Sequence, residues 1–410
     1  MVDIIYYGAT LVVALVAIYV GALVVHKMRD LRFQASAEAA RTSLIQARVR
    51  QLTADAEFEI ARKQGDWSGF RRFLVERVID ECDLVKSFYL KPFDGKPLTP
   101  YRPGQFLTFR VHIPGAPKQE IRCYSLSDCS KTDTYRVTIK KIGLVSGYFH
   151  EQLELGSPLD VKAPSGDFFL DLNTDSPVVL IAGGIGLTPM LSMLNAILEA
   201  GAQREVWLFY GINTARDFIQ RERFRELQKK HSNFHLHICC GNVGAADQRG
   251  VVYDHAERVS VDLFKRLLPS SNYDYYVCGP GAMMTAIVGD LGKWGVPARN
   301  IHYEAFGEAT VRKVAPVTNV ATDDMAAVKV TFARSNSNAK WTPNAGSLLE
   351  LMESAGIPID SGCRAGNCGT CHVAIRSGQV TYLKKAAASI EPNGCLPCIV
   401  IPNSDLLLDA

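Results

Sequence analysis

The sequence predicts a multidomain α+β protein, and three features of the 410-residue chain lead to this prediction. A long stretch without glycine or proline near the N-terminus indicates a helix. Short β-branched and aromatic runs separated by turn residues begin near Trp67 and indicate antiparallel strands. Farther on, an apolar run, a glycine-rich turn and a helical pattern follow one another, as in a parallel α/β unit. At roughly 100 to 200 residues per domain, the length is enough for two to four domains.

The composition excludes two classes of protein. Lysine and arginine total 45 and aspartate and glutamate 42, so the net charge of +3 shows no basic excess for a nucleic-acid partner. An apolar fraction of 47% is too high for a disordered chain. Five of the eleven cysteines lie between Cys363 and Cys398, and such clustering in a large chain favours metal ligation over a disulfide framework.

The N-terminus predicts a transmembrane anchor at residues 1–25. From Ile4 to Val25 there are 22 residues without a charge, and as a helix they would span about 33 Å, close to the thickness of a bilayer. A cleaved signal peptide is the alternative, although the run is long for one and no basic segment precedes it. Basic residues follow the run instead, which predicts a single-pass protein of the inner (cytoplasmic) membrane with its C-terminal bulk in the cytoplasm.

Residues 26–68 predict a helical stalk. No glycine or proline occurs between Ala35 and Gln64, and apolar side chains recur there at helical spacing on one face. These side chains are Ile45, Val49, Leu52, Ala56 and Ile60. Gly65 fits the C-terminal end of such a helix. A docking or dimerisation helix is the alternative to a plain stalk.

Residues 69–172 predict an antiparallel β-barrel. Its strand-like runs are Phe73 to Val78, Val85 to Leu90, Gln105 to Ile113, Tyr135 to Lys141 and Leu159 to Lys162. The segment also contains Arg122-Cys123-Tyr124-Ser125, where strand alternation places Arg122 and Tyr124 on one side and Ser125 on the other. An arginine, a tyrosine and a serine so placed can contact a phosphate, an aromatic ring and a ring heteroatom.

Two glycine-containing turns precede helical patterns. Gly143 to Ser146 opens the first helix, and this start is equally consistent with an anion site and with a plain N-cap. The apolar run Pro177 to Ile181 leads into Gly183 to Pro189 and then into a helix from Met190 to Glu199. Strand, glycine turn and helix in this order favour a dinucleotide site over glycines needed only for packing.

Two more strand-like runs end at glycines. Glu205 to Tyr210 is followed by Gly211, and Tyr273 to Val277 is followed by Cys278-Gly279-Pro280-Gly281. Ligands of open α/β sheets bind at the carboxyl ends of parallel strands. Residues 173–310 therefore predict an α/β nucleotide-binding domain with a parallel sheet.

Five motifs occur here in the order found in the ferredoxin-NADP reductase superfamily. They are Arg122 to Ser125, Gly143 to Ser146, Gly183 to Pro189, Cys278 to Gly281 and Tyr303-Glu304-Ala305-Phe306-Gly307. The chain most resembles the reductase module of flavohaemoglobins, from about Gly69 to Gly307. This resemblance implies that residues 69–172 form a flavin-binding β-barrel, in which Arg122 binds the flavin phosphates, Tyr124 packs on the isoalloxazine and Ser125 contacts its N5.

The same resemblance assigns the remaining site residues. Gly143, Val145 and Ser146 would brace the pyrophosphate, which favours FAD over FMN, and Glu304 and Phe306 would lie near the ring on its nicotinamide side. The predicted nucleotide-binding residues are Gly184, Gly186, Thr188, Pro189, Cys278, Gly279 and Pro280. The predicted catalytic residues are Ser125, Glu304 and Cys278. The globin domain of flavohaemoglobins is absent from the sequence, so no haem chemistry is implied.

The C-terminal cysteines predict a [2Fe-2S] cluster. Cys363, Cys368 and Cys371 have the C-x4-C-x2-C spacing of plant-type ferredoxins, and the glycines between them allow a tight loop with backbone N–H groups directed at the cluster. A zinc site is the alternative. For the fourth ligand, spacing leaves both Cys395 and Cys398 open, and the resemblance to plant-type ferredoxin domains favours Cys398. That resemblance implies a β-grasp fold for residues 326–410, with a linker at residues 311–325.

Together these sites predict an NAD(P)H-dependent flavin and iron-sulfur oxidoreductase. Nicotinamide gives two electrons as hydride and a [2Fe-2S] cluster takes one at a time, so FAD must stand between them. The predicted partners are the bilayer and a separate, membrane-bound oxygenase, hydroxylase or desaturase. The alternative is a subunit of a respiratory NADH:quinone oxidoreductase, which the C-terminal position of the ferredoxin domain disfavours. Asn213, Arg216 and Asp217 leave NADH and NADPH open, with NADH preferred.

Overall fold

The computed structural model describes residues 2–116, 119–130, 133–201, 204–306, 327–366, 368–383, 386 and 390–410, without the side chains of residues 2–14, 47, 50, 51 and 344. The chain forms two compact units, residues 1–60 and residues 61–410. The predicted linker at residues 311–325 lies outside the described residues. The other domain boundaries drawn from the sequence stay predictions.

The first unit consists of a single helix. Helix α1 (Val2–Gly65) is continuous over 64 residues and joins the predicted anchor to the predicted stalk without a break. It ends at Gly65, as the sequence predicts. Most described apolar side chains from Leu15 to Ile60 are exposed within the chain, and Phe58 is half-buried.

The predicted transmembrane anchor at residues 1–25 is contradicted by the structure. Within the part of the chain that is described, no helix combines the length and the apolar character that a membrane span requires. The inner-membrane location is therefore wrong, and the bilayer is not supported as a partner.

The second unit begins with a six-stranded antiparallel sheet. Its strands are β1 (Arg71–Cys82), β2 (Val85–Pro92), β3 (Phe106–Val111), β4 (Glu120–Ser125), β5 (Tyr135–Lys140) and β6 (Pro158–Ser165), in the order β4-β3-β6-β1-β2-β5. Helix α2 (Leu144–Gln152) packs its Phe149 against Phe88 and Phe109, with ring centroids 5.5 Å apart in both pairs. The antiparallel strands confirm the prediction for this segment.

This sheet does not close into the predicted barrel. Strands β4 and β5 lie at its two edges, and among the described residues one isolated bridge, Leu126 to Val137, joins them. Next to this bridge, Ser127 bonds to Arg136 O through both its backbone N–H, at 2.9 Å, and its side chain, which also contacts Thr138. Strand β4 therefore keeps one open edge.

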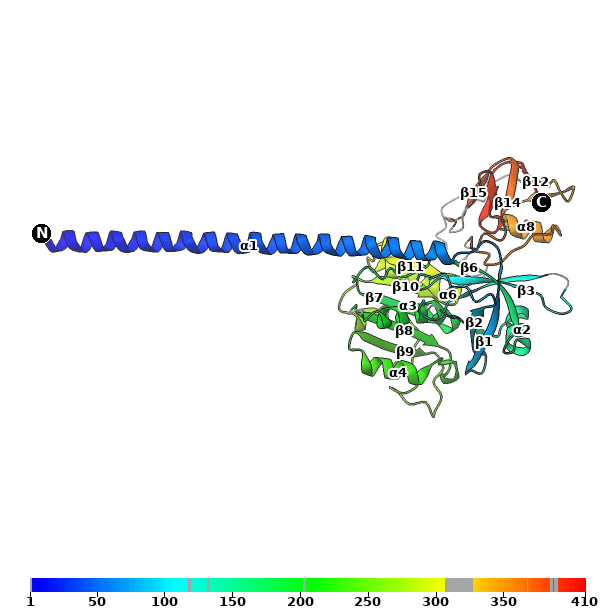
Figure 1. Ribbon diagram of the computed structural model, residues 1–410, viewed down its shortest axis with the longest axis horizontal. Coiled ribbons are helices and arrows are strands. Elements are labelled where there is room, and N and C mark those ends of the chain that lie inside the picture. The colour runs from blue at the N-terminus through cyan, green and yellow to red at the C-terminus, as the bar shows by residue number, and fades with distance from the viewer. Residues whose placement is uncertain are drawn as a thin grey trace. The chain divides into compact units, whose positions relative to one another are not determined.

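A five-stranded parallel sheet follows, with helices on both faces (Figure 1). Its strands are β7 (Val178–Gly183), β8 (Val206–Ile212), β9 (Phe234–Cys240), β10 (Asp274–Cys278) and β11 (Ile301–Glu304), in the order β11-β10-β7-β8-β9. Its helices are α3 (Leu187–Glu199), α4 (Arg221–Lys230), α5 (Val261–Leu267) and α6 (Gly281–Lys293). Strand β7 is buried at every residue because α3 and α4 cover one face and α5 and α6 the other. This confirms the predicted α/β architecture.

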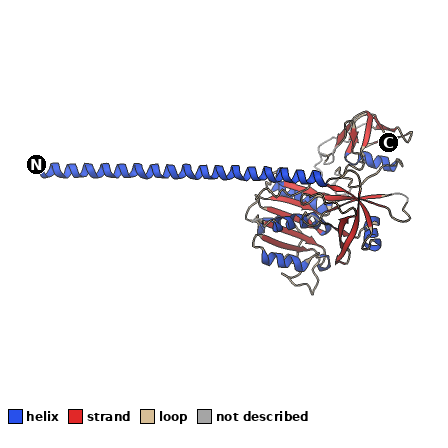
Figure 2. Cartoon of the chain, viewed as in Figure 1, coloured by secondary structure: helices blue, strands red, loops and turns tan. Residues whose placement is uncertain are grey.

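The C-terminal region is rich in short strands (Figure 2). A mixed sheet has the order β13-β12-β18-β14-β16, and β15 pairs with β17. The strands are β12 (Val328–Phe332), β13 (Ser337–Trp341), β14 (Val373–Ser377), β15 (Val380–Tyr382), β16 (Gly394–Cys395), β17 (Val400–Pro402) and β18 (Leu406–Leu408). Helix α8 (Leu348–Ser354) starts at a capping box between Ser347 and Glu350 and packs Leu348 and Met352 against this sheet.

Candidate functional site

The three predicted catalytic residues come together although they are far apart in the sequence. Strands β10 and β11 pair in parallel with Cys278 opposite Glu304. Ser125, at the end of β4, donates a hydrogen bond from its Oγ to Glu304 Oε2 at 3.5 Å. Ser125 and Glu304 are 4% and 6% exposed, so the hydroxyl and the carboxylate meet in a site with little access to water.

Cys278 is fully buried beside this pair. Burial, and then the negative charge of Glu304, raise the pKa of the Cys278 thiol well above its ordinary value. The sulfur is therefore held protonated, which is unsuitable for a thiolate nucleophile. Its catalytic role stays a prediction, and the geometry favours a part in shaping the site.

Ser125 and Glu304 open onto a cleft of about 330 Å³. Its lining comes from β3, β4, the end of β11 and the cysteine-rich loop: Phe106, Arg122, Cys123, Ser125, Glu304, Ala305, Phe306, Gly362, Cys363, Arg364 and Ala365. The predicted flavin-contacting residues Arg122, Ser125, Glu304 and Phe306 thus share one cavity with the predicted cluster ligand Cys363. The sequence did not point to Phe106, Cys123 or the segment Gly362–Ala365 as part of this site.

Alternation along β4 holds for Cys123, Tyr124 and Ser125, whereas Arg122, expected on the side of Tyr124, lines the cleft together with Ser125. Tyr124 packs against Phe109 and Phe149, with ring centroids 5.7 and 5.3 Å apart, while its neighbours Cys123 and Ser125 line the cleft. Arg122 is 45% exposed and forms an ion pair with Glu120, with 3.0 Å between Nη1 and Oε2. Arg122 also lines the cleft. Its guanidinium is accessible to a phosphate, whereas the contact of Tyr124 with a flavin ring stays a prediction.

The start of α2 is braced by a serine. Ser146 Oγ accepts hydrogen bonds from the backbone N–H groups of Ile142 and Gly143, both at 2.9 Å, and donates one to Gly143 O at 3.0 Å. Val145 is buried behind this turn. Gly143 and Gly147 line a separate open hollow of about 440 Å³. Ser146 therefore fixes the turn, and the backbone at Gly143 stays accessible to an anion.

The glycines of the nucleotide-binding turn serve two purposes. A Cβ on Gly186 would lie 2.3 Å from Cys278 O, so this glycine lets the turn pack against the end of β10. A Cβ on Gly183 would lie 2.8 Å from Met283 Sδ, and one on Gly279 would lie 2.6 Å from Met283 Cε. Gly184, in contrast, has φ +52 and open space where a Cβ would stand. Close packing of the backbone and access for a ligand are alternative interpretations of these glycines in the sequence. In the structure, one turn contains glycines that serve each purpose.

The remaining predicted nucleotide-site residues hold this turn in place. Helix α3 begins at Leu187, earlier than the sequence predicts, so Thr188 and Pro189 lie inside its first turn and are buried. Thr188 Oγ1 donates to Ile185 O at 3.1 Å. Pro280 is the N-cap of α6 and is exposed.

A second cleft, of about 190 Å³, lies at the carboxyl ends of β7 and β8. Its lining includes Gly184, Tyr210, Thr214, Arg216 and Asp217. Thr214 donates to Asp217 Oδ2 from both its backbone N–H and its Oγ1, each at 3.0 Å, which fixes the carboxylate. A carboxylate at this end of a parallel sheet is suited to a ribose hydroxyl.

Substituting Gly186 with alanine tests the packing of this turn. The new Cβ would meet the Cys278 carbonyl, so we expect a loss of about 1–3 kcal/mol in the stability of the parallel sheet, together with weaker NADH binding. Gly289→Ala, on the exposed face of α6 with open space around it, is the matched control and is expected to stabilise by about 0.5–1 kcal/mol. Equal urea midpoints for the two variants would contradict the packing argument.

The predicted cluster cysteines lie in two pairs. Cys363 and Cys368 form the first, and the backbone N–H groups of Ala365 and Cys368 point at Cys363 Sγ at 3.4 and 3.3 Å, while that of Cys363 points at Cys368 Sγ at 3.3 Å. Cys371 and Cys398 form the second, with 3.3 Å between their sulfurs. Paired sulfurs, with backbone donors aimed at them, fit a cluster with one pair on each iron.

The two candidates for the fourth ligand lie in different surroundings. Cys398 belongs to a short 3-10 helix (Pro397–Ile399) beside Cys371. Cys395 is fully buried in β16, pairs with Val373, and packs in the apolar core with Val400. Burial raises the pKa of the Cys395 thiol to about 12, as expected of a thiol that packs as an apolar side chain.

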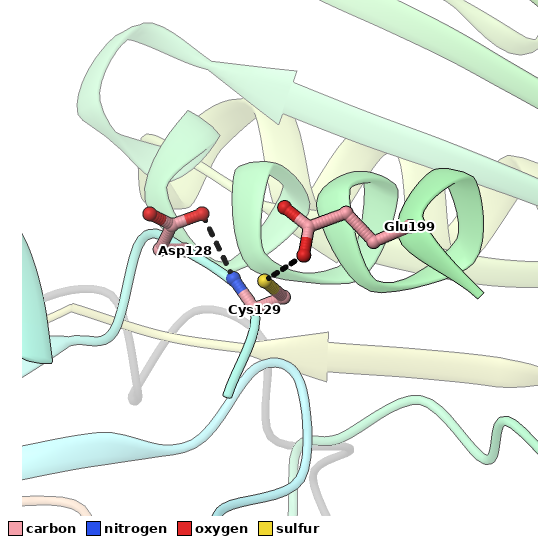
Figure 3. A group of neighbouring side chains, drawn as sticks. All are labelled: Asp128, Cys129 and Glu199. Carbon is pink, nitrogen blue, oxygen red and sulfur yellow. Dashed lines mark hydrogen bonds between the residues drawn. The ribbon is translucent and has the colours of Figure 1, made fainter. Parts of the chain in front are cut away.

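Asp128, Cys129 and Glu199 form a separate polar group (Figure 3). Cys129 Sγ donates to Glu199 Oε2 at 2.8 Å, and Cys129 N donates to Asp128 Oδ1 at 3.0 Å. Asp128 also accepts from Asn195 Nδ2 at 3.0 Å. Because Glu199 and Asn195 belong to α3, these bonds fasten the loop after β4 to the helix that follows the nucleotide-binding turn.

Comparison with known proteins agrees with this division of the chain. Residues 180–289 match the oxidoreductase NAD-binding domain, and residues 334–403 match the 2Fe-2S iron-sulfur cluster binding domain. A flavohemoprotein of Bacillus cereus is 34% identical over 265 residues, which cover 63% of this chain and 66% of that protein. The chain thus spans just under two thirds of the length of this relative.

Two solved structures match overlapping parts of the chain. The flavohem-like FAD/NAD-binding domain of the nitric oxide dioxygenase from Vibrio cholerae is 32% identical, with a TM-score of 0.53, over 58% of this chain and 99% of that one. Phthalate dioxygenase reductase is 26% identical, with a TM-score of 0.52, over 83% of this chain and 98% of that one. The second similarity therefore includes the region of the cluster cysteines.

The fold and the matches together define an NAD-binding flavin oxidoreductase with an iron-sulfur domain. The chain belongs to the family of FAD- and NAD-binding reductases that includes the reductase portion of flavohemoproteins. Its C-terminal part is a [2Fe-2S] domain. The predicted cofactors FAD, NAD and [2Fe-2S] are confirmed at the level of these domains, in place of the zinc alternative.

Proposed function

We propose that the protein is the reductase component of an oxygenase system. It takes electrons from NADH and passes them through FAD and the [2Fe-2S] cluster to a separate oxygenase, hydroxylase or desaturase. The observation that carries this proposal is the 330 Å³ cleft, because residues of the flavin side and of the cluster loop line it together. When bound, FAD would accept a hydride and give up its electrons singly, which a one-electron cluster requires.

The polar residues at the inner end of the cleft have two tasks. The single hydroxyl proton of Ser125 is donated to Glu304, so the oxygen would accept a hydrogen bond from a protonated ring nitrogen, and the hydroxyl would turn away from Glu304 to donate to an unprotonated one. Their burial keeps water away from the reacting atoms, which limits loss of the hydride to side reactions. Arg122 would bind a phosphate at the exposed end, where its guanidinium remains accessible.

Four cysteines would hold the cluster. We assign Cys363 and Cys368 to one iron and Cys371 and Cys398 to the other, on the support of the two sulfur pairs. The cluster's charge would be compensated by the backbone donors of the loop. Cys363 belongs to the lining of the cleft, so the iron it binds would be the one that receives electrons from the flavin side.

The choice of nucleotide rests on the second cleft. Asp217 carries a negative charge there, and its fixed carboxylate would accept a hydrogen bond from the ribose and repel a 2′-phosphate. Arg216 and Lys140, which line the same cleft, have the opposite effect. We propose NADH as the donor because the carboxylate is held in place by two hydrogen bonds.

The arrangement of domains supports a separate protein as the electron acceptor. Phthalate dioxygenase reductase, described as a modular structure for electron transfer from pyridine nucleotides to [2Fe-2S], covers most of this chain. Apart from the cluster cysteines, the described residues contain one group of His, Cys, Asp or Glu side chains with metal-ligand geometry, Asp128, Cys129 and Glu199. The polar atoms of this group bond to one another and to α3. Substrate oxidation therefore belongs on a partner.

An anaerobic titration of the purified full chain with NADH tests this function. Two electrons in FAD and one in the cluster require about 1.5 NADH per chain for complete reduction, with flavin bleaching and a reduced-cluster EPR signal. NADPH at the same concentration is expected to react more slowly. An end point at one NADH per chain without the EPR signal would show that the cluster takes no part, and equal rates with both nucleotides would overturn the proposed preference.

A further inference from the structure

Cys123 lies between the flavin side of the cleft and the cluster loop. It is the residue of β4 two places before Ser125, so strand alternation directs both side chains to the cleft that they line. Its thiol neighbours the side chains of Cys363 and Cys368, and Cys363 lines the same cleft. The proposed ligands of one iron therefore share a neighbour that the proposed function leaves without a role.

The cluster loop approaches β4 closely at this point. A Cβ on Gly362 would lie 3.0 Å from Ile121 Cγ2 and 3.1 Å from Cys368 Sγ, so the absence of a side chain there brings the strand and the loop together. The contact is specific to this edge of the sheet because β4 has no further strand beside it. The open edge of the sheet is thus where the loop packs.

The Cys123 side chain is held in place from behind. Thr108 pairs with Cys123 in the β3–β4 register, and its Oγ1 lies 3.4 Å from Cys123 Sγ. Thr108 is 1% exposed, so this contact is shielded from water. A thiol fixed on one side by a hydroxyl and facing two sulfurs on the other is oriented to interact with those sulfurs.

We propose that Cys123 is a positioning residue that donates a hydrogen bond to the sulfurs of Cys363 and Cys368 and so raises the reduction potential of the cluster. The inference rests on the proposed function through the assignment of these two cysteines as ligands. A reduced cluster carries one more negative charge, and a donor to its ligand sulfurs stabilises that charge. The donor would thereby make the cluster a better acceptor for electrons from the flavin side.

The test is an EPR-monitored redox titration of the cluster in the full chain, made with chemical reductants and without NADH. Cys123→Ala removes the donor and is expected to lower the ratio of reduced to oxidised cluster about threefold to tenfold at a fixed potential. A tenfold change corresponds to about 59 mV for a one-electron couple. Cys123→Ser keeps a donor and is expected to retain most of the potential of the unmodified protein.

Cys239→Ala is the matched control. It removes a buried thiol from β9 in the parallel sheet and is expected to leave the cluster potential unchanged. An unchanged potential in Cys123→Ala, with the cluster present, would overturn the proposal. Loss of the cluster from Cys123→Ala would also overturn it, because Cys123 would then be a ligand. Absence of a cluster from the unmodified protein would contradict the proposed function instead.

Discussion

Replacing Cys398 with alanine is expected to abolish the [2Fe-2S] cluster, whereas replacing Cys395 with alanine is expected to leave it in place. Each iron of such a cluster needs two protein sulfurs, and Cys398 Sγ lies 3.3 Å from Cys371 Sγ. Cys395 is fully buried in the apolar core, so its loss removes packing and no ligand. We expect Cys395→Ala to cost about 0.5–3 kcal/mol of stability.

Visible absorption and the NADH end point measure this difference together. Cys398→Ala should lose the cluster bands and the reduced-state EPR signal, yet its flavin should still bleach, with an end point of about one NADH per chain. Cys395→Ala should keep the bands, the signal and the end point of about 1.5. A cluster that persists in Cys398→Ala and disappears from Cys395→Ala would reverse the ligand assignment.

The cluster loop shows where sequence spacing is sufficient and where it is not. Cys363, Cys368 and Cys371 are close in sequence, and local glycines at positive φ, Gly366 and Gly369, bring their sulfurs together. The fourth cluster ligand is separated from these three cysteines by a long segment that includes β14 and β15. A difference of three residues there separates a strand in the core from a 3-10 turn at the cluster, and spacing alone does not distinguish the two.

The sequence predicts several residues of the flavin side of the cleft, but it predicts only part of their spatial arrangement. Ser125 and Glu304 are 179 residues apart, and no period in the sequence relates them. Cys278 and Glu304 lie side by side because β10 and β11 pair in parallel. This alignment depends on the order of strands in the sheet. Cys123 had a usable signal, because alternation places it on the same side of β4 as Ser125.

The N-terminal helix shows the opposite case. Its apolar run is a strong sequence signal for a membrane span, yet among the described residues no helix meets the requirement for one. The absence of internal helix breakers correctly predicts a continuous helix, since α1 extends to Gly65. The local sequence pattern therefore predicts that these residues form a helix, but it does not predict the environment of that helix.

Replacing Ser125 with alanine is expected to slow the reduction of the flavin by NADH about 100-fold to 1,000-fold, the usual loss when one preorganised donor is removed from an active site. The hydroxyl is 4% exposed and is oriented by Glu304 at 3.5 Å, so no water has ready access to replace it. Stopped-flow mixing with NADH under anaerobic conditions measures the rate. Ser125→Thr, which keeps the hydroxyl, is expected to recover most of it.

Ser127→Ala separates this catalytic effect from a loss of packing. Ser127 is fully buried two residues farther along, where its Oγ accepts from Arg136 Nε at 3.2 Å and lies 2.8 Å from Thr138 Oγ1. Its removal leaves buried polar partners unsatisfied, so we expect a loss of about 1–3 kcal/mol of stability and an unchanged rate of flavin reduction. If Ser125→Ala kept its full flavin content and the rate of the unmodified protein, the hydroxyl would be structural, and the reacting nitrogen would have to be contacted by another residue of the cleft.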